Sequence, residues 1–333
     1  MYNLYQSEVW KDIQTKVYNK PYVFVNIFWK EYFWLIHTKK IWPIKLSRLQ
    51  IMWVELPSDK EYVKSELQRI KNIYQKEKWI IFIQLCLLNE IIRFENCWQR
   101  DENFVTDMRQ MRLNIRQEIT ETYGLEVSFR ENMPQANIIY DITKSDEDLI
   151  KEMNSWCKER IKKAMKKWIE FGIATPDQYD IFYKKWTEVS GKKWFNIIPK
   201  SQYEKLIRYI TQNNRGNLFT SHIDGDIIAW SICIYDEHRI IYLYGFANRA
   251  YQNIWWHHFL KFKIFGRARK NWMTYVDMMW WAPTGFPDHP LNWVSKFKES
   301  LWWTKIEQYG SYDLVIKPFL YKLSKLYFNI THH

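Results

Sequence analysis

Apolar and polar residues alternate along this chain with two different periods, which together predict a mixture of strands and helices. A period of two is typical of strands, and apolar residues three or four apart are typical of helices. In the first part of the chain, the expected helices are 6–16, 58–78 and 103–123, and the expected strands are 22–36, 41–54, 79–88 and 125–129. Ser58 is the expected cap of the second helix, and Gly124 is the expected stop of the third.

The rest of the chain repeats this mixture. Ser145 is expected to open one long helix with Leu149, Met153 and Cys157 on one face. Asp224-Gly225 stands between two strand patterns and is a strong signal for a two-residue hairpin turn. Further helices are expected near the prolines at 176 and 199, over 253–270 and from 318 onward, and strands over 139–142, 218–223, 226–235, 239–246, 274–278 and 313–316.

The order of these later elements is helix, helix, hairpin, strand, helix, strand, which resembles a GNAT-like acyltransferase unit. Because the first half mixes strands and helices in the same way, we expect an α+β fold of two tandem GNAT-like domains without a coiled-coil arm. The expected domains are 1–145 and 146–317, and a C-terminal helix at 318–333 is expected to pack back on the first.

The charge of the chain suggests a class of partner. Lys and Arg number 49 against 37 acidic residues, which gives a net charge of +12. Basic proteins often bind nucleic acid or another anionic surface. Charge alone does not separate tRNA from a phosphate-rich small substrate, or either of these from a merely soluble basic protein.

The sequence predicts neither a membrane span nor a metal site. The longest apolar run, 79–92, is interrupted by polar residues and is too short to cross a bilayer. The charged residues Glu8 and Lys11 lie within the first expected helix, so no signal peptide is expected and the expected location is the cytoplasm. The four cysteines have no CxxC spacing and no paired histidines, which indicates free thiols.

Several segments resemble the Fem family of non-ribosomal peptidyltransferases. The segment NMPQANIIYDIT precedes a helix in which Arg160, Ile161 and Ala164 resemble the family's Arg-x-x-Ile-x-x-Ala in compressed form. The segments IIYLYGFANRAYQ, TYVDMMW and WVSKFKESLWW resemble its Tyr-x-x-Gly strand, its Tyr-x-Asp-x-x-Gly strand and its Gly-x-x-x-Phe-Lys-x-x-Phe-Gly-Gly. The likeness covers 130–325 well and 1–129 loosely, and the missing arm favours the FemX-like members.

This resemblance implies a reaction and its partners. A Fem-type enzyme moves an amino acid, usually glycine, alanine or serine, from aminoacyl-tRNA to a peptidoglycan precursor. The first domain would then bind the precursor and the second the aminoacyl-tRNA, with no other cofactor, no metal and a monomeric state. The location would be the cytoplasm or the inner face of the membrane. Both the amino acid and the acceptor, UDP-MurNAc-pentapeptide or its lipid-linked form, stay open.

The resemblance also assigns catalytic residues. Lys298 matches the family's catalytic lysine and is expected to stabilise the oxyanion of the tetrahedral intermediate or the end of the tRNA. Phe297 beside it is expected to stack on a terminal base. Asp277 follows a predicted strand, where it would accept a proton from the attacking amine or cap the following loop.

Other basic and aromatic residues are candidates for binding. Lys158, Lys162 and Lys166 lie four apart on one helical face, which either follows the tRNA backbone or is simply solvated. The family's phosphate-binding lysine and arginine align with Gln14 and near Ile198, so the chain departs from the family at both phosphate contacts, with Lys11 and Lys16 beside the first and Lys192 and Lys193 upstream of the second. The candidates for this substrate-binding role are Lys11, Lys16, Lys192, Lys193, Tyr203 and Tyr244.

Tryptophan is unusually frequent and glycine unusually rare. The chain has 20 Trp and 9 Gly, whereas glycine normally makes up about 7% of a protein. Tryptophans that stand where the family has glycine or another small residue are Trp53, Trp168, Trp230, Trp272, Trp280, Trp293, Trp302 and Trp303. One hypothesis is that the source organism reads UGA as glycine; the alternative is genuine tryptophan in an aromatic-rich protein.

Two rival functions stay open. A CoA-dependent GNAT N-acyltransferase needs a glycine-rich pyrophosphate loop, and the segment 249–256 has no glycine as written. Reading Trp255 and Trp256 as glycine would partly restore one. The third reading is a non-catalytic RNA-binding module, for which only charge and aromatic content speak.

Overall fold

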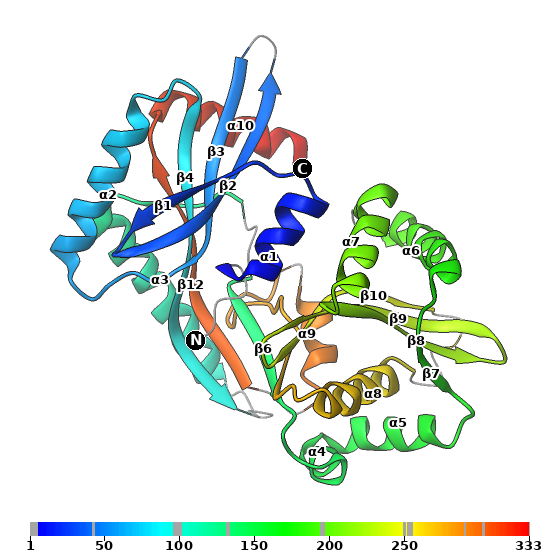
Figure 1. Cartoon of the computed structure of the whole chain (residues 1–333). Helices are drawn as coiled ribbons and strands as arrows, with labels where there is room; N and C mark the ends of the chain where they lie inside the picture. Colours follow the sequence, from blue (N-terminus) through cyan, green and yellow to red (C-terminus); the bar gives the residue numbers. More distant parts are fainter. Residues whose placement is uncertain are drawn as a thin grey trace.

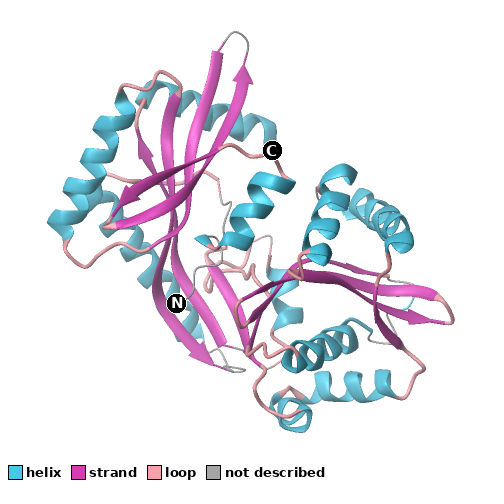
Figure 2. Ribbon diagram, viewed as in Figure 1, coloured by secondary structure: helices cyan, strands magenta, loops and turns pink. Residues whose placement is uncertain are grey.

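The computed structural model describes residues 6–41, 44–95, 102–130, 134–193, 197–248, 251, 256–289, 291–301 and 304–332. These residues form two lobes on one continuous mixed sheet (Figure 1, Figure 2). The strand order is β1-β2-β3-β4-β12-β6-β11-β10-β9-β8-β7, with β5 paired to β12. The mixed α/β character predicted from the alternating patterns is confirmed.

The first lobe surrounds the strands that begin and end the chain. Its strands are β1 (Tyr22–Ile27), β2 (Lys30–Ile41), β3 (Ile44–Val54), β4 (Ile80–Glu95), β5 (Glu126–Val127) and β12 (Thr304–Val315). Its helices are α1 (Glu8–Asp12), the π-helix η2 (Ile13–Val17), α2 (Lys60–Gln75), α3 (Glu102–Tyr123) and α10 (Pro318–His332). Buried apolar residues of α2 and α3 cluster with one face of β4, and α10 packs on the other face, where Tyr321 meets Phe82.

The second lobe has helices on both faces of its strands. Its strands are β6 (Ala136–Asp141), β7 (Glu170–Ile173), β8 (Gly216–Ile223), β9 (Asp226–Asp236), β10 (Arg239–Ala247) and β11 (Tyr275–Asp277). Its helices are α4 (Asp146–Glu152), α5 (Ser155–Met165), the 3₁₀ turn η3 (Pro176–Gln178), α6 (Tyr179–Lys193), α7 (Lys200–Gln212), α8 (Trp256–Lys270) and α9 (Asn292–Lys298). Helices α6 and α7 cover one face, and α5 and α8 cover the other (Figure 1).

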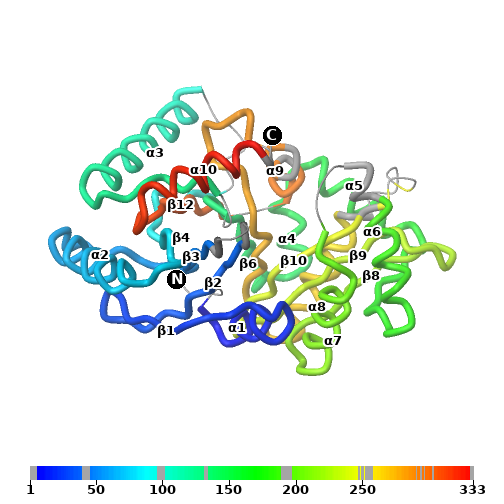
Figure 3. The backbone as a smooth tube through the Cα atoms, turned by 90° about the horizontal axis from the view of Figure 1, so that it is seen from above, coloured from blue at the N-terminus to red at the C-terminus, as the bar shows by residue number. Residues whose placement is uncertain are grey.

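The lobes are joined by shared strands and by α1. β12 pairs with β4 along its length, and its first four residues also pair with β6. β6 precedes the boundary expected at residue 145, yet it pairs with β11 of the second lobe. Helix α1 and η2 lie between the lobes (Figure 3), where Val9 and Ile13 join the core cluster of α7. The junction is therefore packed on both sides.

Four expected boundaries were wrong. The strand expected over 22–36 is a hairpin, because Phe28 and Trp29 turn the chain without the residues that usually signal a turn. Asp59, rather than Ser58, caps α2. The long helix expected from Ser145 ends at Glu152, and Asn154 caps a new helix. The last strand begins at Thr304, nine residues before the expected start.

Four of the tryptophans that the structure describes have left-handed backbone conformations. Their φ angles are +60° at Trp29, +58° at Trp53, +62° at Trp272 and +31° at Trp280. A left-handed conformation costs a residue with a Cβ atom about 1–2 kcal/mol, and glycine is the residue that adopts it without this cost. Three of the four are among the positions where the sequence already suggested glycine.

Two of these tryptophans occupy positions where glycine has a defined structural role. Phe28 and Trp29 both have positive φ in the β1–β2 turn, as in the type I′ turns that Asn-Gly favours. Trp272 follows α8, where its N–H bonds to the Arg269 carbonyl and the N–H of Met273 bonds to the Ala268 carbonyl. This is a Schellman motif, and glycine is the usual residue at its left-handed position.

Candidate functional site

The parallel strands β10 and β11 pair over only three residues. Their ladder ends at Ile241 and Asp277, although β10 continues to residue 247. Beyond the ladder, β10 has a bulge between Tyr242 and Tyr244. Tyr244 and Met279, the second residue after the end of β11, line the same pocket. The end of the ladder therefore opens a gap between two central strands, a place where α/β proteins commonly bind ligands.

This gap meets an open pocket of about 420 Å³ between the lobes. Both lobes contribute to its wall: β2, β3, α1 and η2 from the first, and α7, β10 and the segment after β11 from the second. The lining residues are Trp10, Gln14, Tyr18, Lys20, His37, Arg48, Gln50, Met52, Ile198, Gln202, Leu243, Tyr244, Met279 and Trp280. We call it the interlobe pocket.

Three basic side chains of the first lobe converge in the interlobe pocket. Burial lowers the pKa of Arg48 to about 10 and that of His37 to about 3, and it also lowers the pKa of Lys20. Mutual repulsion adds to the effect of burial on Lys20 and His37, because Arg48 acts on both. An anionic ligand would relieve this repulsion, so the pocket suits a phosphate or carboxylate group.

Buried glutamine amides hold this basic group in place. Lys20 donates to Gln14 Oε1 at 2.8 Å, and His37 Nε2 lies 2.7 Å from Gln50 Oε1. Gln50 in turn donates to Gln84 Oε1 at 3.0 Å. Gln14, Gln50 and Gln84 are buried, so their fixed amides orient the basic side chains before any ligand arrives.

Lys298 lies on α9 and is buried behind the wall of the interlobe pocket. Its Nζ donates to the carbonyl oxygens of Met278 at 2.9 Å, Met279 at 2.5 Å and Trp280 at 2.5 Å. Burial lowers the pKa of Lys298, whereas the nearby Asp277 carboxylate favours its charged form. Its three bonds go to backbone, so in this structure Lys298 holds the segment after β11 in place.

Asp277 acts on the same segment. Its Oδ1 accepts a hydrogen bond from the Met279 N–H at 2.7 Å, and its Oδ2 lies 3.6 Å from Arg239 Nη1. Burial raises the pKa of Asp277, and Arg239 opposes that rise. This is the geometry of a loop cap, one of the two roles expected for Asp277.

A buried group of three charges holds the far end of this segment. Glu307 lies 2.8 Å from Arg112 and 2.9 Å from Lys305, and all three side chains are fully buried. Glu307 also accepts a hydrogen bond from the Thr284 N–H at 3.0 Å. Residues 278–284 are therefore held from α9 at one end and from β12 at the other.

Lys261 of α8 faces the other side of β10. Its Nζ lies 3.2 Å from Ser231 Oγ and 3.4 Å from the centre of the Tyr242 ring. Gly245 lies beside the same hydroxyl, so this lysine stands next to the part of β10 beyond the ladder. Burial lowers the pKa of Lys261 to about 7, and the repulsion from Lys298 contributes. An amine of this kind exchanges protons near neutral pH.

Some of the predicted site residues lie at the interlobe pocket, and others are packed in the core of the second lobe. Tyr244 lines the interlobe pocket, and Lys298 and Asp277 lie directly behind it. Phe297 packs edge-on against His258 in the core cluster of α8. Tyr203 is fully buried in the core around α7 and donates to the Tyr179 carbonyl, so it does not line this pocket.

Neither Lys11 nor Lys16 lines the interlobe pocket. Lys16 pairs with Asp12, and Lys11 lies over the Phe24 ring. The side chains of Lys192 and Lys193 lie outside the described residues, as do Trp302 and Trp303. On the opposite face of the second lobe, α5 carries Lys158 and Lys162, and Lys166 follows at its C-cap.

Sequence patterns gave no indication of Lys20, His37, Arg48 or Lys261. Lys20 was the next lysine after the two candidates, but it follows the helix rather than lying within it. His37 and Arg48 alternate with apolar residues on β2 and β3, and they are opposite one another in the β2–β3 register. Only strand pairing reveals such a neighbour pair.

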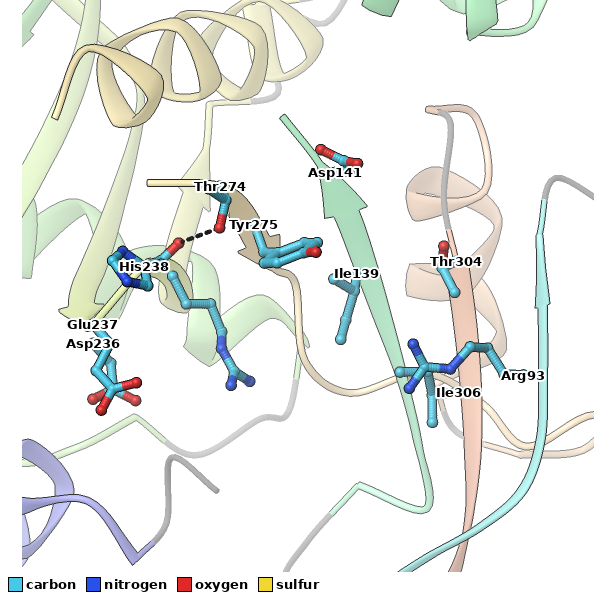
Figure 4. Close-up of a pocket in the computed structure, with 11 residues that line it drawn as sticks. Arg93, Ile139, Asp141, Asp236, Glu237, His238, Thr274, Tyr275, Thr304 and Ile306 are labelled. Carbon is cyan, nitrogen blue, oxygen red and sulfur yellow. Dashed lines mark hydrogen bonds between the residues drawn. The ribbon is translucent and has the colours of Figure 1, made fainter. Parts of the chain in front are cut away.

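A second pocket, of about 350 Å³, lies at the other end of the same strands (Figure 4). Arg93, Arg239 and His238 line it together with Asp141, Asp236 and Glu237. Tyr275 stands at the start of β11, so this pocket is at the opposite end of the strand from the gap. Its mixed charges do not favour an anion as the interlobe pocket does.

Comparison with known proteins places the fold. Residues 155–286 match the acetyltransferase (GNAT) domain family. A crystal structure of FemX superposes with a TM-score of 0.68 at 14% identity, covering 97% of this chain and 94% of that one. The fold is similar to that of FemX. A conserved protein of unknown function from Bacteroides thetaiotaomicron VPI-5482 superposes with a TM-score of 0.51 at 12% identity, covering 92% and 91%.

These likenesses confirm the expected fold class of two tandem GNAT-like units. A search of curated protein sequences finds no match.

Among the described residues, no three His, Cys, Asp or Glu side chains are grouped as metal ligands would be. No helix within the described ranges combines the length and the apolar character that crossing a bilayer requires.

Proposed function

We propose that this protein is an aminoacyltransferase that moves glycine, alanine or serine from aminoacyl-tRNA to the stem-peptide amine of a peptidoglycan precursor. The observation that carries the proposal is that the basic interlobe pocket opens at the gap between β10 and β11. A diphosphate-bearing acceptor would bind through Lys20 and Arg48, and its amine would reach the gap beside Trp280. The FemX-like fold supports this arrangement.

The donor would enter from the α8 face. The basic helix α5 packs against α8 on that face, so Lys158 and Lys162 would follow the tRNA backbone. The acceptor in the interlobe pocket and the donor on the α8 face would then reach the gap between β10 and β11 from opposite faces of the sheet, so they would not compete for one opening. This arrangement puts the acyl carbonyl beside the bulge of β10, where backbone N–H groups can bind its oxygen.

Lys261 is our candidate for the proton acceptor. The attacking amine must lose a proton as the new amide bond forms and the ester oxygen of the tRNA leaves. Asp277 already accepts a hydrogen bond from Met279. Lys261 and Lys298 both have a pKa of about 7, but Lys298 donates to three backbone carbonyls, whereas Lys261 contacts a hydroxyl and a ring beside β10. We assign Lys298 the role of shaping the gap, and Asp277 that of capping the loop.

A transfer assay tests the function. The protein would be mixed with alanyl-, seryl- or glycyl-tRNA and either UDP-MurNAc-pentapeptide or its lipid-linked form, and products would be weighed by mass spectrometry. Product formed by the wild type and by Lys16→Ala, but lost with Arg48→Ala, supports the proposal. Lys16 is the matched control because it is a lysine near the interlobe pocket that does not line it. No product with any donor and either acceptor overturns the proposal.

A CoA-dependent N-acyltransferase is the second candidate, favoured by the match of residues 155–286 to a GNAT acetyltransferase domain. The segment expected to bind the pyrophosphate, 249–256, lies mostly outside the described residues. Calorimetry with acetyl-CoA separates the two functions. Micromolar binding of acetyl-CoA, without aminoacyl transfer, would favour this candidate.

We further propose that the source gene encodes glycine at some tryptophan positions through UGA codons. The left-handed backbones at Trp53, Trp272 and Trp280 support this idea, and Trp29 extends it to a position that the sequence did not suggest. Trp168 and Trp230 are absent from the left-handed positions. Sequencing the gene decides: UGG at Trp272 and Trp280 would refute the proposal.

A further inference from the structure

Helix α10 is apolar on two opposite faces. At 100° per residue, Tyr321, Ser324 and Phe328 lie on the face that packs on the first lobe, where Tyr321 and Phe328 both contact Phe129. A second apolar stripe runs along the opposite face, over about 16 Å of helix at 1.5 Å per residue. The stripe consists of four exposed side chains, Phe319, Leu323, Leu326 and Ile330.

The flanks of this stripe are basic. Lys322 is exposed on α10, and Lys325 lies near Glu126 at 4.0 Å. Lys39 of β2 stands over the ring of Tyr327, 4.0 Å from its centre. The sequence from 314 to 333 contains lysines but no Asp or Glu. An exposed apolar stripe with lysine flanks and an interfacial tyrosine has the composition of helices that lie in a membrane surface.

We propose that α10 docks this protein onto an anionic phospholipid membrane, with the stripe entering the acyl boundary and the lysines contacting the headgroups. Charge favours this occupant over a second copy of the chain, because two copies carrying +12 each would place their lysines face to face. The proposal concerns binding and does not depend on the proposed reaction.

The position of α10 relates this surface to the interlobe pocket. A neighbouring pocket of about 270 Å³ is lined by Ser324 and Tyr327 of α10 and by His37 and Arg48. His37 and Arg48 also line the interlobe pocket. The helix thus lines a pocket that shares His37 and Arg48 with the interlobe pocket, and docking would bring these basic residues close to anionic groups at the membrane surface.

Vesicle cosedimentation tests the proposal. The wild type should bind vesicles of phosphatidylglycerol and phosphatidylcholine at least tenfold more tightly than vesicles of phosphatidylcholine alone, and added salt should weaken the binding. The double variant Leu323→Ser/Leu326→Ser should lose at least tenfold in affinity. These residues are 46% and 58% exposed, so the melting temperature should fall only modestly and no further than in the control variant below.

The control is a second double variant, Ile73→Ser/Ile181→Ser, which removes apolar side chains of similar exposure, 48% and 47%, from α2 and α6. It should bind vesicles like the wild type. An equal loss in both double variants, or no preference of the wild type for phosphatidylglycerol, overturns the proposal. A dimer in sedimentation equilibrium that only Leu323→Ser/Leu326→Ser dissociates would also overturn it, in favour of a second copy.

Discussion

The ammonium of Lys298 lies 2.5 Å from the carbonyl oxygen of Trp280, a residue whose φ is +31°. The same ammonium binds the two preceding carbonyls. Three carbonyl oxygens can turn toward one lysine only if the chain bends sharply, and the left-handed conformations of Met279 and Trp280 provide that bend. The wall of the interlobe pocket thus depends on one buried side chain and two unusual backbone conformations.

Lys298→Met should destabilise the protein by about 3 kcal/mol, because it leaves buried carbonyls without their donor. Urea unfolding would measure this loss. Lys158→Met, on the surface of α5, should change stability by less than about 0.5 kcal/mol. If Lys298→Met keeps wild-type stability but loses activity, the lysine acts on substrate and our positioning role is wrong.

Trp272→Gly should stabilise the protein by about 1 kcal/mol, because glycine removes the left-handed strain at the end of α8. The side chain is 87% exposed, so little packing is lost. Trp168→Gly is the matched control: Trp168 is 95% exposed and has no left-handed backbone. The melting temperature should rise in the first variant and not in the second, and an equal change in both would contradict the argument.

The proposed role of Lys261 predicts a pH dependence of transfer. If its neutral amine accepts the proton, kcat should rise as pH passes through about 7. Lys261→Met should lower kcat and remove this rise, with little change in the KM for the acceptor. A rise that persists in Lys261→Met would assign the proton to another group.

Lys261 also predicts a pH dependence of stability. Its pKa is lowered on folding, so between about pH 7 and its unfolded value of about 10.4 the unfolded chain binds the extra proton. The free energy of unfolding should therefore rise with pH across this window relative to Lys261→Met. The buried cysteines and tyrosines titrate in both proteins, so their contributions cancel when the unfolding free energy of the variant is subtracted from that of the wild type. If the difference in unfolding free energy between the two proteins does not change with pH, the pKa of Lys261 is not lowered on folding and its amine is exposed to water.

Glu307 predicts sensitivity to acid. Burial alone would raise its pKa, but Lys305 and Arg112 lower it to about 2. Its contribution to stability should be complete above its ordinary pKa of about 4.3 and be lost as pH falls toward 2. Glu307→Gln should cost about 3–5 kcal/mol at neutral pH, because it leaves buried cations without their counter-charge. Equal acid midpoints for variant and wild type would contradict this.

The sequence alone predicted most elements and the fold class, because periodicity and turn signals act locally. Asp224-Gly225 marked its hairpin, and φ is positive at both residues. The β1–β2 hairpin was not predicted, because neither residue of its turn, Phe28-Trp29, is typical of a turn. The sequence also pointed to Lys298 and Asp277 through a resemblance, but it gave no information on what either side chain touches.

Only the tertiary structure decided the site. His37 and Arg48 become neighbours through the β2–β3 register, and Lys20 lines the same pocket. Lys261 gains its lowered pKa from the residues packed around it, which are far away in sequence. Burial and charge proximity depend on contacts between distant segments, and periodicity along the chain contains no record of those contacts.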